Sequence, residues 1–593
     1  MESGSTGTKG KNSEIYPEAH PFRVSRAGQA SLRIGLLLDG PRLSAFFARI
    51  IEDITCSNFA SLELLVFQKK TQPLAPASPR ESLIGTLKKR LLDPRLRKTA
   101  LYDLYLRLDQ RTKTPNHPQN LVDCSSLLAG IESIEVEPIG KKFVQRFPPD
   151  AIEKIQSKKL DVLLRFGFNI LHGEILTSAR YGVWSYHHGD NEFYRGGPPH
   201  FWELYEKAPL SGVILQVLTE ELDGGVVLCK SLFATQPTVM VSRNRFAPYW
   251  GSTDLVIRKL NELHQFGWDS VKERAVPPAA YKGKRKIYRS PTNAEIVRWL
   301  GPVFLKKSVR YPFRKKTVQH WRIGVRVGGK RLLDSASEND LEGFKWIEPN
   351  KGQFWADPFP IEHDRKTWVF FEDFSYRESR GWISCAELSA EGALISATPC
   401  LDNRNCHYSY PHVFRSGSDF FMVPEARDSH SVDLYRCSEF PSKWIRHRTL
   451  LRGKFVDTTI WQQDETWWLL TTRAEPDAGA GSLLLFYSDS LSGEWQIHPA
   501  NPISTDIRNN RGAGRVFQAG SRWIRPSQSC CPTYGYSFSL NEITEISRTR
   551  YAERLLKTVL PGGGLCGVHT YNFAENIETI DGATMTPVKK LIP

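Results

Sequence analysis

Apolar residues near the start of the chain fall into short runs that alternate with a helical pattern. Residues 32–38 form one apolar run, a tight turn follows at Asp39-Gly40-Pro41, and residues 43–54 show helical spacing. A second apolar run covers residues 62–67. A strand, a helix and a second strand in this order are typical of a βαβ unit, which predicts a parallel sheet.

The same pattern continues to about residue 235. Residues 148–158 read as a helix that precedes a strand beginning near residue 160, and the segment that follows completes a doubly wound α/β sheet. Residues 251–267 predict another helix. Residues 69–120 are basic and contain prolines, which predicts an irregular insertion.

From about residue 318 the pattern changes to short β runs with alternating aromatic residues, and a repeat appears. Its landmarks lie 46 to 56 residues apart, at Asp357, Pro411, Asp457, Ala513 and Val568. Five such units of four strands predict a five-bladed β-propeller. The predicted strand 320–326 would complete the last blade, and this closure removes exposed sheet edges.

A chain of 593 residues is too long for one core and predicts several domains. We expect a disordered tail at 1–29, an α/β domain at 30–235, a helical and basic connector at 236–317, and the propeller at 318–593. The first 22 residues carry no apolar stretch typical of a secretory signal. No apolar run approaches the ~18 residues that a membrane span needs.

Ten cysteines without a C-x-x-C pair are typical of reduced thiols, so we expect a cytoplasmic protein. The net charge of +15 is uneven: residues 282–316 hold twelve Lys or Arg and one acid, Glu295. Three interpretations stay open for this segment. It is an amphipathic helix on an anionic membrane, a site for a nucleotide diphosphate or sugar phosphate, or a solvated linker. No known nucleic-acid module accompanies the charge, so nucleic acid is not an expected partner.

The segment 182–223 carries the first candidate chemistry. Ser185 and His187 lie two residues apart in a predicted strand, so their side chains share a face. A polar, glycine-punctuated loop then ends at Arg195-Gly196, and Asp223 follows a second strand. Strand ends are where an open α/β sheet forms its ligand crevice.

These residues resemble the signature of the formyltransferase family that uses 10-formyltetrahydrofolate. His187, Arg195-Gly196 and Asp223 fall at matching offsets, whereas Ser185 replaces the family's Asn. The resemblance covers about residues 30–235. It implies that His187 stabilises an oxyanion and transfers a proton and that Asp223 orients His187 and acts as a base. Ser185 would donate in place of Asn, and Arg195 and Gly196 would shape the substrate loop.

The second half resembles the propeller of glycoside hydrolase family 43, and more closely the related domain of glucosamine inositolphosphorylceramide transferase-like proteins. The supporting motifs include Ala356-Asp357-Pro358, His498-Pro499-x-Asn501-Pro502 and Arg511-x-Ala513-Gly514. The resemblance implies that Asp357 is a general base and that Asp457 matches a second acid. Glycosidic cleavage uses two carboxyl groups, and the resemblance leaves the proton donor unassigned, with Glu425 as one candidate. Alternatively, these acids only satisfy backbone donors at blade turns. We predict no metal.

Three functional hypotheses follow. The first is formyl transfer from 10-formyltetrahydrofolate to an amine, such as an amino sugar or nucleotide sugar, with the propeller recognising or processing the saccharide. In the second, the propeller is a glycosyl transferase or hydrolase and the α/β domain is degenerate. The third is a glycan-binding protein without catalysis. Each places the protein in the cytoplasm, with residues 282–316 as the segment that would contact a membrane.

Overall fold

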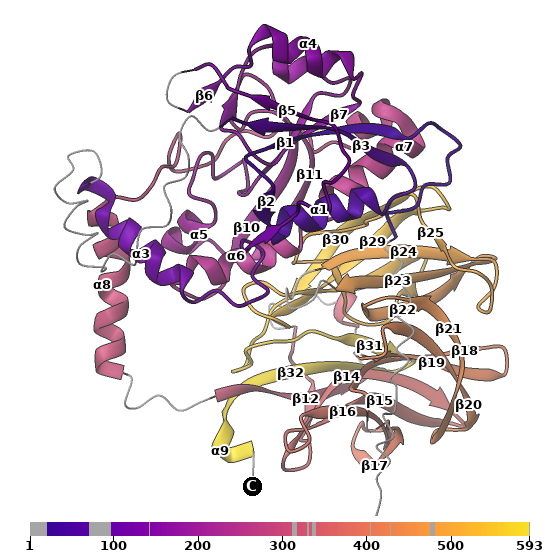
Figure 1. The fold of residues 1–593 in the computed structure, drawn as a ribbon. Coiled ribbons are helices and arrows are strands. Elements are labelled where there is room, and N and C mark those ends of the chain that lie inside the picture. The colour runs from indigo at the N-terminus through magenta and orange to yellow at the C-terminus, as the bar shows by residue number, and fades with distance from the viewer. Residues whose placement is uncertain are drawn as a thin grey trace, which may run out of the picture.

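The computed structural model describes residues 21–69, 97–140, 143–310, 317–328, 331–334, 340–403, 405–426, 428–474 and 481–591. An α/β half, drawn in indigo to magenta, lies against a β-propeller drawn in pink through orange to yellow (Figure 1). The predicted fold class is therefore confirmed in both halves. The first 20 residues of the predicted tail lie outside the described residues.

The α/β half is built on a seven-stranded sheet in the order β11-β10-β9-β7-β1-β3-β5. Its strands are β1 (Leu32–Leu38), β3 (Ala60–Gln68), β5 (Ser133–Val136), β7 (Val162–Arg165), β9 (Val183–His187), β10 (Leu210–Val217) and β11 (Val226–Ala234). The five strands from β9 to β5 run parallel, whereas β10 pairs antiparallel with both β9 and β11. The sheet thus presents the carboxyl ends of β7 and β9 at one edge, which is where the first candidate site was predicted.

Helices cover both faces of this sheet because the side chains of its strands alternate. Leu36 packs with Phe46 of α1 on one face, and Leu37 packs with Ile155 of α4 on the other. The helices are α1 (Ala45–Thr55), α3 (Ala100–Gln110), α4 (Pro149–Ser157), α5 (Phe201–Glu206), α6 (Val241–Trp250) and α7 (Leu255–Glu273). Minor elements are β2 (Arg42–Ser44), β4 (Leu121–Asp123), β6 (Val144–Gln145), β8 (Ile170–Leu171), η1 (Arg97–Thr99) and η2 (Glu174–Thr177).

Two segments differ from the sequence-based expectation. Helix α3 lies inside residues 69–120, where an irregular insertion was predicted, because Tyr102 and Tyr105 bury one face of it against Phe201. Residues 70–96 of that insertion lie outside the described residues. Residues 21–29, assigned to the tail, pack on the α/β half: Phe22 is buried, and Arg23 Nη2 lies 2.6 Å from Asp53 Oδ1.

The second half consists of five four-stranded blades arranged as a ring. The first three blades are β14 (Gln353–His363), β15 (Lys366–Ser375), β16 (Arg380–Leu388) and β17 (Leu394–Leu401); β18 (Tyr408–Ser416), β19 (Asp419–Ala426), β20 (Ser431–Glu439) and β21 (Lys443–Arg452); and β22 (Phe455–Gln463), β23 (Thr466–Ala474), β24 (Gly481–Ser488) and β25 (Gln496–Ile497). The fourth holds β26 (Arg511–Gly512), β28 (Arg522–Ser529), β29 (Ser537–Ile546) and β30 (Tyr551–Val559), with β27 (Phe517–Ala519) paired to β28.

The fifth blade closes the ring with strands from both ends of this half. It contains β31 (Tyr571–Ala574), β32 (Ile577–Pro587), β12 (Thr317–Val327) and β13 (Lys345–Ile347). Strands β12 and β32 pair antiparallel from Thr317↔Pro587 to Val327↔Ile577. The predicted closure by residues 320–326 is confirmed. Short helices η4 (Leu332–Asp334) and α9 (Val588–Leu591) flank this blade.

The two halves share one hydrophobic core. Leu228 of β11 and Leu260 of α7 belong to the same buried cluster as Leu469, Leu484 and Ile507 of the propeller. The propeller also extends the α/β sheet at its β11 edge, because the Ile507 N–H donates to the Leu232 carbonyl oxygen at 3.0 Å. Helices α6 and α7, predicted as part of a connector, pack on the α/β sheet.

The basic segment begins on the α/β surface and continues as α8 (Asn293–Arg310), which extends away from the sheet in Figure 1. Three of its cations contact acids of the described chain: Lys282 contacts Glu192, Lys284 contacts Glu206, and Arg285 contacts Glu295. Residues 311–316 of the predicted basic segment lie outside the described residues. Within the described residues, no helix has the length and apolar character to cross a membrane.

Candidate functional site

The first strand of three consecutive blades contains the same backbone irregularity. Asp357, Tyr410 and Asp457 have φ values of 52°, 44° and 52°. Each residue lies within a register shift of its strand, between Ala356 and Phe359 in the first case. A β-bulge redirects a side chain out of the regular alternation. This recurring bulge is the structural form of the repeat seen in the sequence.

A cavity of about 590 Å³ lies at these bulges. All three predicted propeller acids, Asp357, Glu425 and Asp457, line it. They come from three strands, β14, β19 and β22, so the fold brings together groups that are far apart in the chain. Five aromatic side chains add flat apolar surface, and they are Trp321, Phe354, Phe374, Phe455 and Tyr534. Such a mixture of aromatic surface with a few polar groups is typical of small-molecule sites.

Asp457 is held by a charged partner. Arg511 Nε donates to Asp457 Oδ2 at 2.6 Å, and the main-chain N–H of Asp457 donates to Glu425 Oε2 at 3.3 Å. The Arg511 guanidinium also lies over the ring of Tyr534, 5.1 Å from its centroid. The Asp457 side chain is therefore fixed in position next to the Glu425 carboxyl group.

Asp357 belongs to a buried network that crosses into the fifth blade. Its Oδ1 accepts a hydrogen bond from Thr570 Oγ1 at 2.8 Å, and its Oδ2 accepts one from the Tyr410 N–H at 3.2 Å. The Asp357 N–H in turn donates to Asp581 Oδ2 at 3.0 Å. Asp357 thus satisfies backbone donors, as one interpretation expected, and also lines the cavity.

Burial sets the protonation of the cavity acids. It raises the pKa of Glu425 to about 8, and the nearby Asp457 carboxylate adds to this effect while Arg511 opposes it. Burial also raises the pKa of Asp357 to about 6, with Asp581 and Asp457 adding and His569 opposing. Near neutral pH, Glu425 therefore carries a proton while Asp357 is mostly ionised. One carboxyl group can donate a proton and another can accept one.

His569 is the positive counterpart of these acids. Its Nδ1 lies 2.7 Å from Asp581 Oδ2, and its Nε2 lies 3.6 Å from Asp357 Oδ1. Burial alone would lower the pKa of His569, but the Asp581 and Asp357 carboxylates outweigh it and raise this pKa to about 9. These three residues have the donor set of a small metal site. A protonated imidazole already supplies a cation there, and a metal would have to displace its proton.

Several residues of this cavity were not predicted as site residues. Glu372 and His407 lie opposite each other, with His407 Nε2 3.3 Å from Glu372 Oε1, and burial raises the pKa of Glu372. Arg511 and His569 lie within two residues of Ala513 and Val568, the landmarks of the fourth and fifth repeats. Their proximity to these landmarks could have identified them.

The structure also brings together the predicted residues of the α/β half. His187 Nδ1 lies 3.3 Å from Asp223 Oδ1, and His187 Nε2 lies 2.8 Å from the carbonyl oxygen of Tyr194. A carbonyl oxygen can only accept, so Nε2 is a donor here. Burial lowers the pKa of His187, but the Asp223 carboxylate outweighs this and the net shift is upward. Both ring nitrogens of His187 therefore have partners within the protein.

Ser185 is engaged as well. Its Oγ accepts a hydrogen bond from Arg165 Nε at 3.0 Å and donates to the Tyr186 carbonyl oxygen at 3.2 Å. Arg165 also donates through Nη1 to the carbonyl oxygens of Phe168 and Asn169. A group that stabilises a formyl oxyanion needs an N–H or O–H aimed at open space. In this arrangement Ser185 and His187 do not fit 10-formyltetrahydrofolate chemistry.

Arg195 and Gly196 help to hold the loop near Asp223. The Gly196 N–H donates to Asp223 Oδ2 at 2.8 Å, and Arg195 Nη1 donates to Glu221 Oε1 at 3.1 Å. Gly196 has a φ of 90°, and a Cβ there would lie 2.4 Å from the Tyr288 carbonyl oxygen. Only glycine fits this close approach without strain.

The comparisons with known proteins give different results for the two halves. Residues 348–561 match the family described as glucosamine inositolphosphorylceramide transferase 1, N-terminal. The transferase of that name from Oryza sativa subsp. japonica is 31% identical over 205 residues, which are 34% of this chain and 27% of the relative. The predicted resemblance of the propeller half is thus confirmed for this segment. The chain matches about a quarter of the relative's length.

Two solved structures are among those found similar to parts of this chain. Glycinamide ribonucleotide transformylase 1 from Symbiobacterium toebii is 12% identical, covers 44% of this chain and 95% of its own, and has a TM-score of 0.26. The catalytic domain of a GH62 α-L-arabinofuranosidase from Coprinopsis cinerea is 12% identical, covers 46% of this chain and 97% of its own, and has a TM-score of 0.31. Values this low identify no activity, and membership of the formyltransferase family stays a prediction.

Proposed function

We propose that the propeller is the working half of this protein and that its cavity binds a saccharide and breaks or forms a glycosidic bond. Glu425 is the proton donor to the leaving oxygen, and Asp357 is the base that activates water or an acceptor hydroxyl. This is the transferase or hydrolase alternative from the sequence. The single observation that carries it is the convergence of Asp357, Glu425 and Asp457 on one cavity, with the Glu425 pKa raised to about 8.

The charges of the cavity favour an amino sugar as ligand. Asp357, Glu372 and Glu425 each have a pKa raised by burial and by neighbouring acids. A sugar ammonium group would relieve this repulsion and let one of these acids ionise. Tyr534, which is 47% exposed, provides an aromatic face at the cavity for a sugar ring. The name of the matched family includes glucosamine, which agrees with this choice.

Calorimetry with a glucosamine trisaccharide and its N-acetylated counterpart tests the binding. We expect saturable binding of the amino form, weakened by Asp357→Asn and Glu425→Gln. Asp419→Asn, at a partly exposed acid outside the cavity, is the matched control and should leave binding unchanged. Mass spectrometry of the incubated trisaccharide then tests for cleavage or transfer. If neither form binds, or if the control and cavity variants behave alike, the proposal fails.

Formyl transfer by the α/β half is the rival proposal. The His187–Asp223 pair at 3.3 Å favours it, whereas the internal bonds of Ser185 and His187 oppose it. We infer that this half now serves as a scaffold for the propeller. Binding of a 10-formyltetrahydrofolate analogue, measured by calorimetry on wild type and on Ser185→Asn, decides the point. Saturable binding that Ser185→Asn strengthens would support formyl transfer instead.

A further inference from the structure

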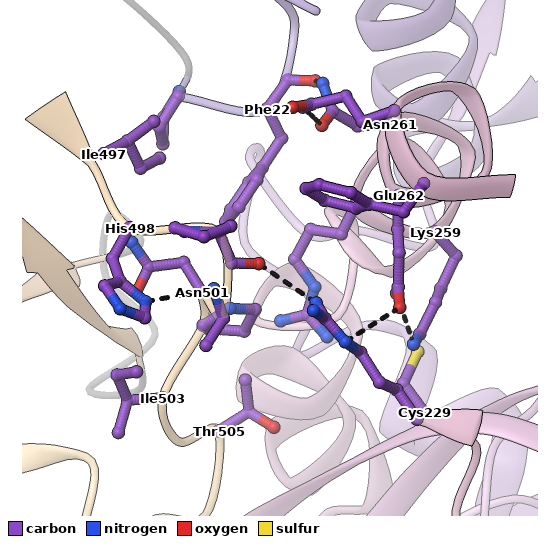
Figure 2. A pocket seen from close by; sticks show the side chains of 18 of the residues that line it. Phe22, Cys229, Lys259, Asn261, Glu262, Ile497, His498, Asn501, Ile503 and Thr505 are labelled. Carbon is purple, nitrogen blue, oxygen red and sulfur yellow. Dashed lines mark hydrogen bonds and ion pairs between the residues drawn. The ribbon is translucent and has the colours of Figure 1, made fainter. Parts of the chain in front are cut away.

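A second cavity lies in the seam between the two halves and shares no lining residue with the propeller cavity. Its volume is about 430 Å³. The walls are the segment around Phe22, strand β11 at Cys229, helix α7, and the propeller loop 497–505 (Figure 2). In the figure, His498 and Ile503 on the propeller side face Glu262 and Lys259 of α7. None of the functions considered above uses this cavity.

The propeller wall is a rigid loop without charge. It contains the His498-Pro499-x-Asn501-Pro502 motif, in which the Asn501 amide bonds both the N–H and the carbonyl oxygen of Leu485, at 2.8 and 2.7 Å. His498 Nε2 donates to the Ser547 carbonyl oxygen at 2.7 Å, and its Nδ1 accepts from the Ala500 N–H. Burial lowers the pKa of His498. The imidazole is therefore neutral. Its hydrogen bonds, with those of Asn501, show that the motif holds this loop in position.

The α/β wall carries a surplus of positive charge. Lys259 and Arg274 share the Glu262 carboxylate, at 2.7 and 3.7 Å. Arg258 Nη1 lies 3.7 Å from Asp254 Oδ1, and Arg473 of the propeller lies 3.8 Å from the other oxygen of Asp254. Three of the four cations that line the cavity, Arg258, Lys259 and Arg274, thus have one carboxylate of their own and share a second with Arg473.

Lys230 also lines the cavity, but its charge is met elsewhere. Its Nζ lies 2.9 Å from Asp190 Oδ1 and 2.6 Å from Glu192 Oε1. Neither acid lines the cavity. These two acids neutralise the charge of Lys230. Lys230 therefore neither adds to nor reduces the surplus positive charge of Arg258, Lys259 and Arg274.

Arg258 is the decisive side chain. It is 7% exposed, and its Nε and Nη1 have no hydrogen-bond partner among the described residues. Buried guanidinium groups normally have their donors satisfied, because an unpaired buried charge costs several kcal/mol. Arg258 Nη1 faces Asp254 Oδ1, so the Nε–H is the donor of this fixed planar group that is left for an oxygen of a bound oxyanion.

We propose that this seam cavity binds a small ligand that carries a phosphate group. Arg258 and Arg274 hold the phosphate oxygens, Lys259 adds charge, and the apolar remainder lies against Phe22 and Ile497. The volume lies within the ~300–1,000 Å³ typical of small-molecule sites. A soluble phosphate ester and a lipid headgroup share this chemistry. Because both halves supply the walls, a bound ligand would contact both halves and stabilise their association.

Calorimetry with phenyl phosphate tests the site on the full chain, with inorganic phosphate and benzyl alcohol as partial probes. We expect phenyl phosphate to bind more tightly than either one. Arg258→Gln and Arg274→Gln should each weaken it about tenfold or more, since each removes a charge-assisted hydrogen bond. Lys272→Gln changes an exposed cation of the same helix that contacts Asp269, and it should leave binding unchanged. Dihexanoyl phosphatidic acid against glycerol phosphate distinguishes a lipid source from a soluble one.

Arg258→Gln changes a buried side chain and could disturb the fold of the seam. Arg274 is half-exposed, so Arg274→Gln tests the same site without that risk. Phenyl phosphate should also raise the melting temperature of wild type more than that of Arg274→Gln, because a ligand stabilises the folded state in proportion to how tightly it binds. Absence of saturable binding at millimolar phenyl phosphate would overturn the proposal. So would equal binding by the Arg274→Gln variant, or equal affinity for benzyl alcohol.

Discussion

The main-chain N–H of Asp457 donates to Glu425 Oε2 across two neighbouring blades, at 3.3 Å. This bond fixes the Glu425 carboxyl group beside a second acid, and burial in that position raises its pKa to about 8. The contact therefore joins the architecture of the ring to the chemistry of its cavity.

Glu425→Gln keeps the shape of the side chain but removes its transferable proton. We expect the glycosidic reaction to slow by at least about 10²-fold, which is typical when a general acid is lost. Mass spectrometry of the products of the trisaccharide measures the rate. An unchanged rate would remove Glu425 from the proposed role.

The rate of the glycosidic reaction should show a bell-shaped dependence on pH. Asp357 must be ionised and has a pKa of about 6, whereas Glu425 must be protonated and has a pKa of about 8. Activity is thus expected to rise near pH 6 and to fall near pH 8, as properties of the interacting group of acids. The Glu425→Gln variant should lose the alkaline limb of its residual activity. A profile without that limb in wild type would contradict the assignment.

Stability should fall as pH rises through the neutral range. Glu425 has a folded pKa of about 8 against an ordinary value of 4.5, so the folded state binds more protons than the unfolded state between these values. His569 acts in the same direction, because its pKa rises from 6.5 to about 9. Glu425→Gln should raise the melting temperature by a few degrees at pH 8 and have little effect at pH 5. The opposite order in thermal scans would contradict this linkage.

The shared core predicts that both halves unfold together. Ile507 is 3% exposed and belongs to the cluster that spans them, so Ile507→Ala should cost about 2–5 kcal/mol and lower one common transition. Ile395→Ala removes the same atoms at a 60% exposed site and serves as control. Calorimetry that resolves two transitions, with only one shifted, would show independent halves.

Membrane contact by the basic segment stays a proposal that vesicles can test. Lys282, Lys284 and Arg285 already contact acids of the protein, whereas Lys286, Arg289 and Arg298 are exposed and should contribute most to any attraction to anionic lipid among the described side chains. Sedimentation with phosphatidylserine vesicles should lose binding in a Lys286→Glu, Arg289→Glu variant. Equal recovery of both proteins with and without vesicles would favour the solvated linker.

The architecture was readable from the sequence where its signals are local or periodic. Residues 32–38 form β1 as predicted, and the landmarks from Asp357 to Val568 identified five blades. The same periodicity located Asp357 and Asp457 at one cavity. Local pattern failed for residues 21–29, which pack on the α/β half, and at α3, where Tyr102 and Tyr105 form a helix face that only distant residues cover.

The partners of the site residues could not be read in the same way. Arg511 reaches Asp457 across two consecutive blades, and His569 reaches Asp357 because the ring brings the fifth blade beside the first; spacing along the chain shows neither contact. In the α/β half, the sequence placed Ser185, His187 and Asp223 together but gave no sign that Arg165 and the Tyr194 carbonyl group occupy their donors and acceptors. The spacing of these residues in the sequence predicted that they lie close together. Their hydrogen bonds in the structure determine which of them can donate or accept a proton.

The pairing of β11 with the propeller segment around Ile507 has a consequence for any attempt to divide this chain. If the chain were cut between the halves, β11 would become an edge strand with unpaired backbone groups beside exposed apolar side chains. Such an edge promotes aggregation. Either half produced by itself should therefore be insoluble, whereas the whole chain keeps this edge paired.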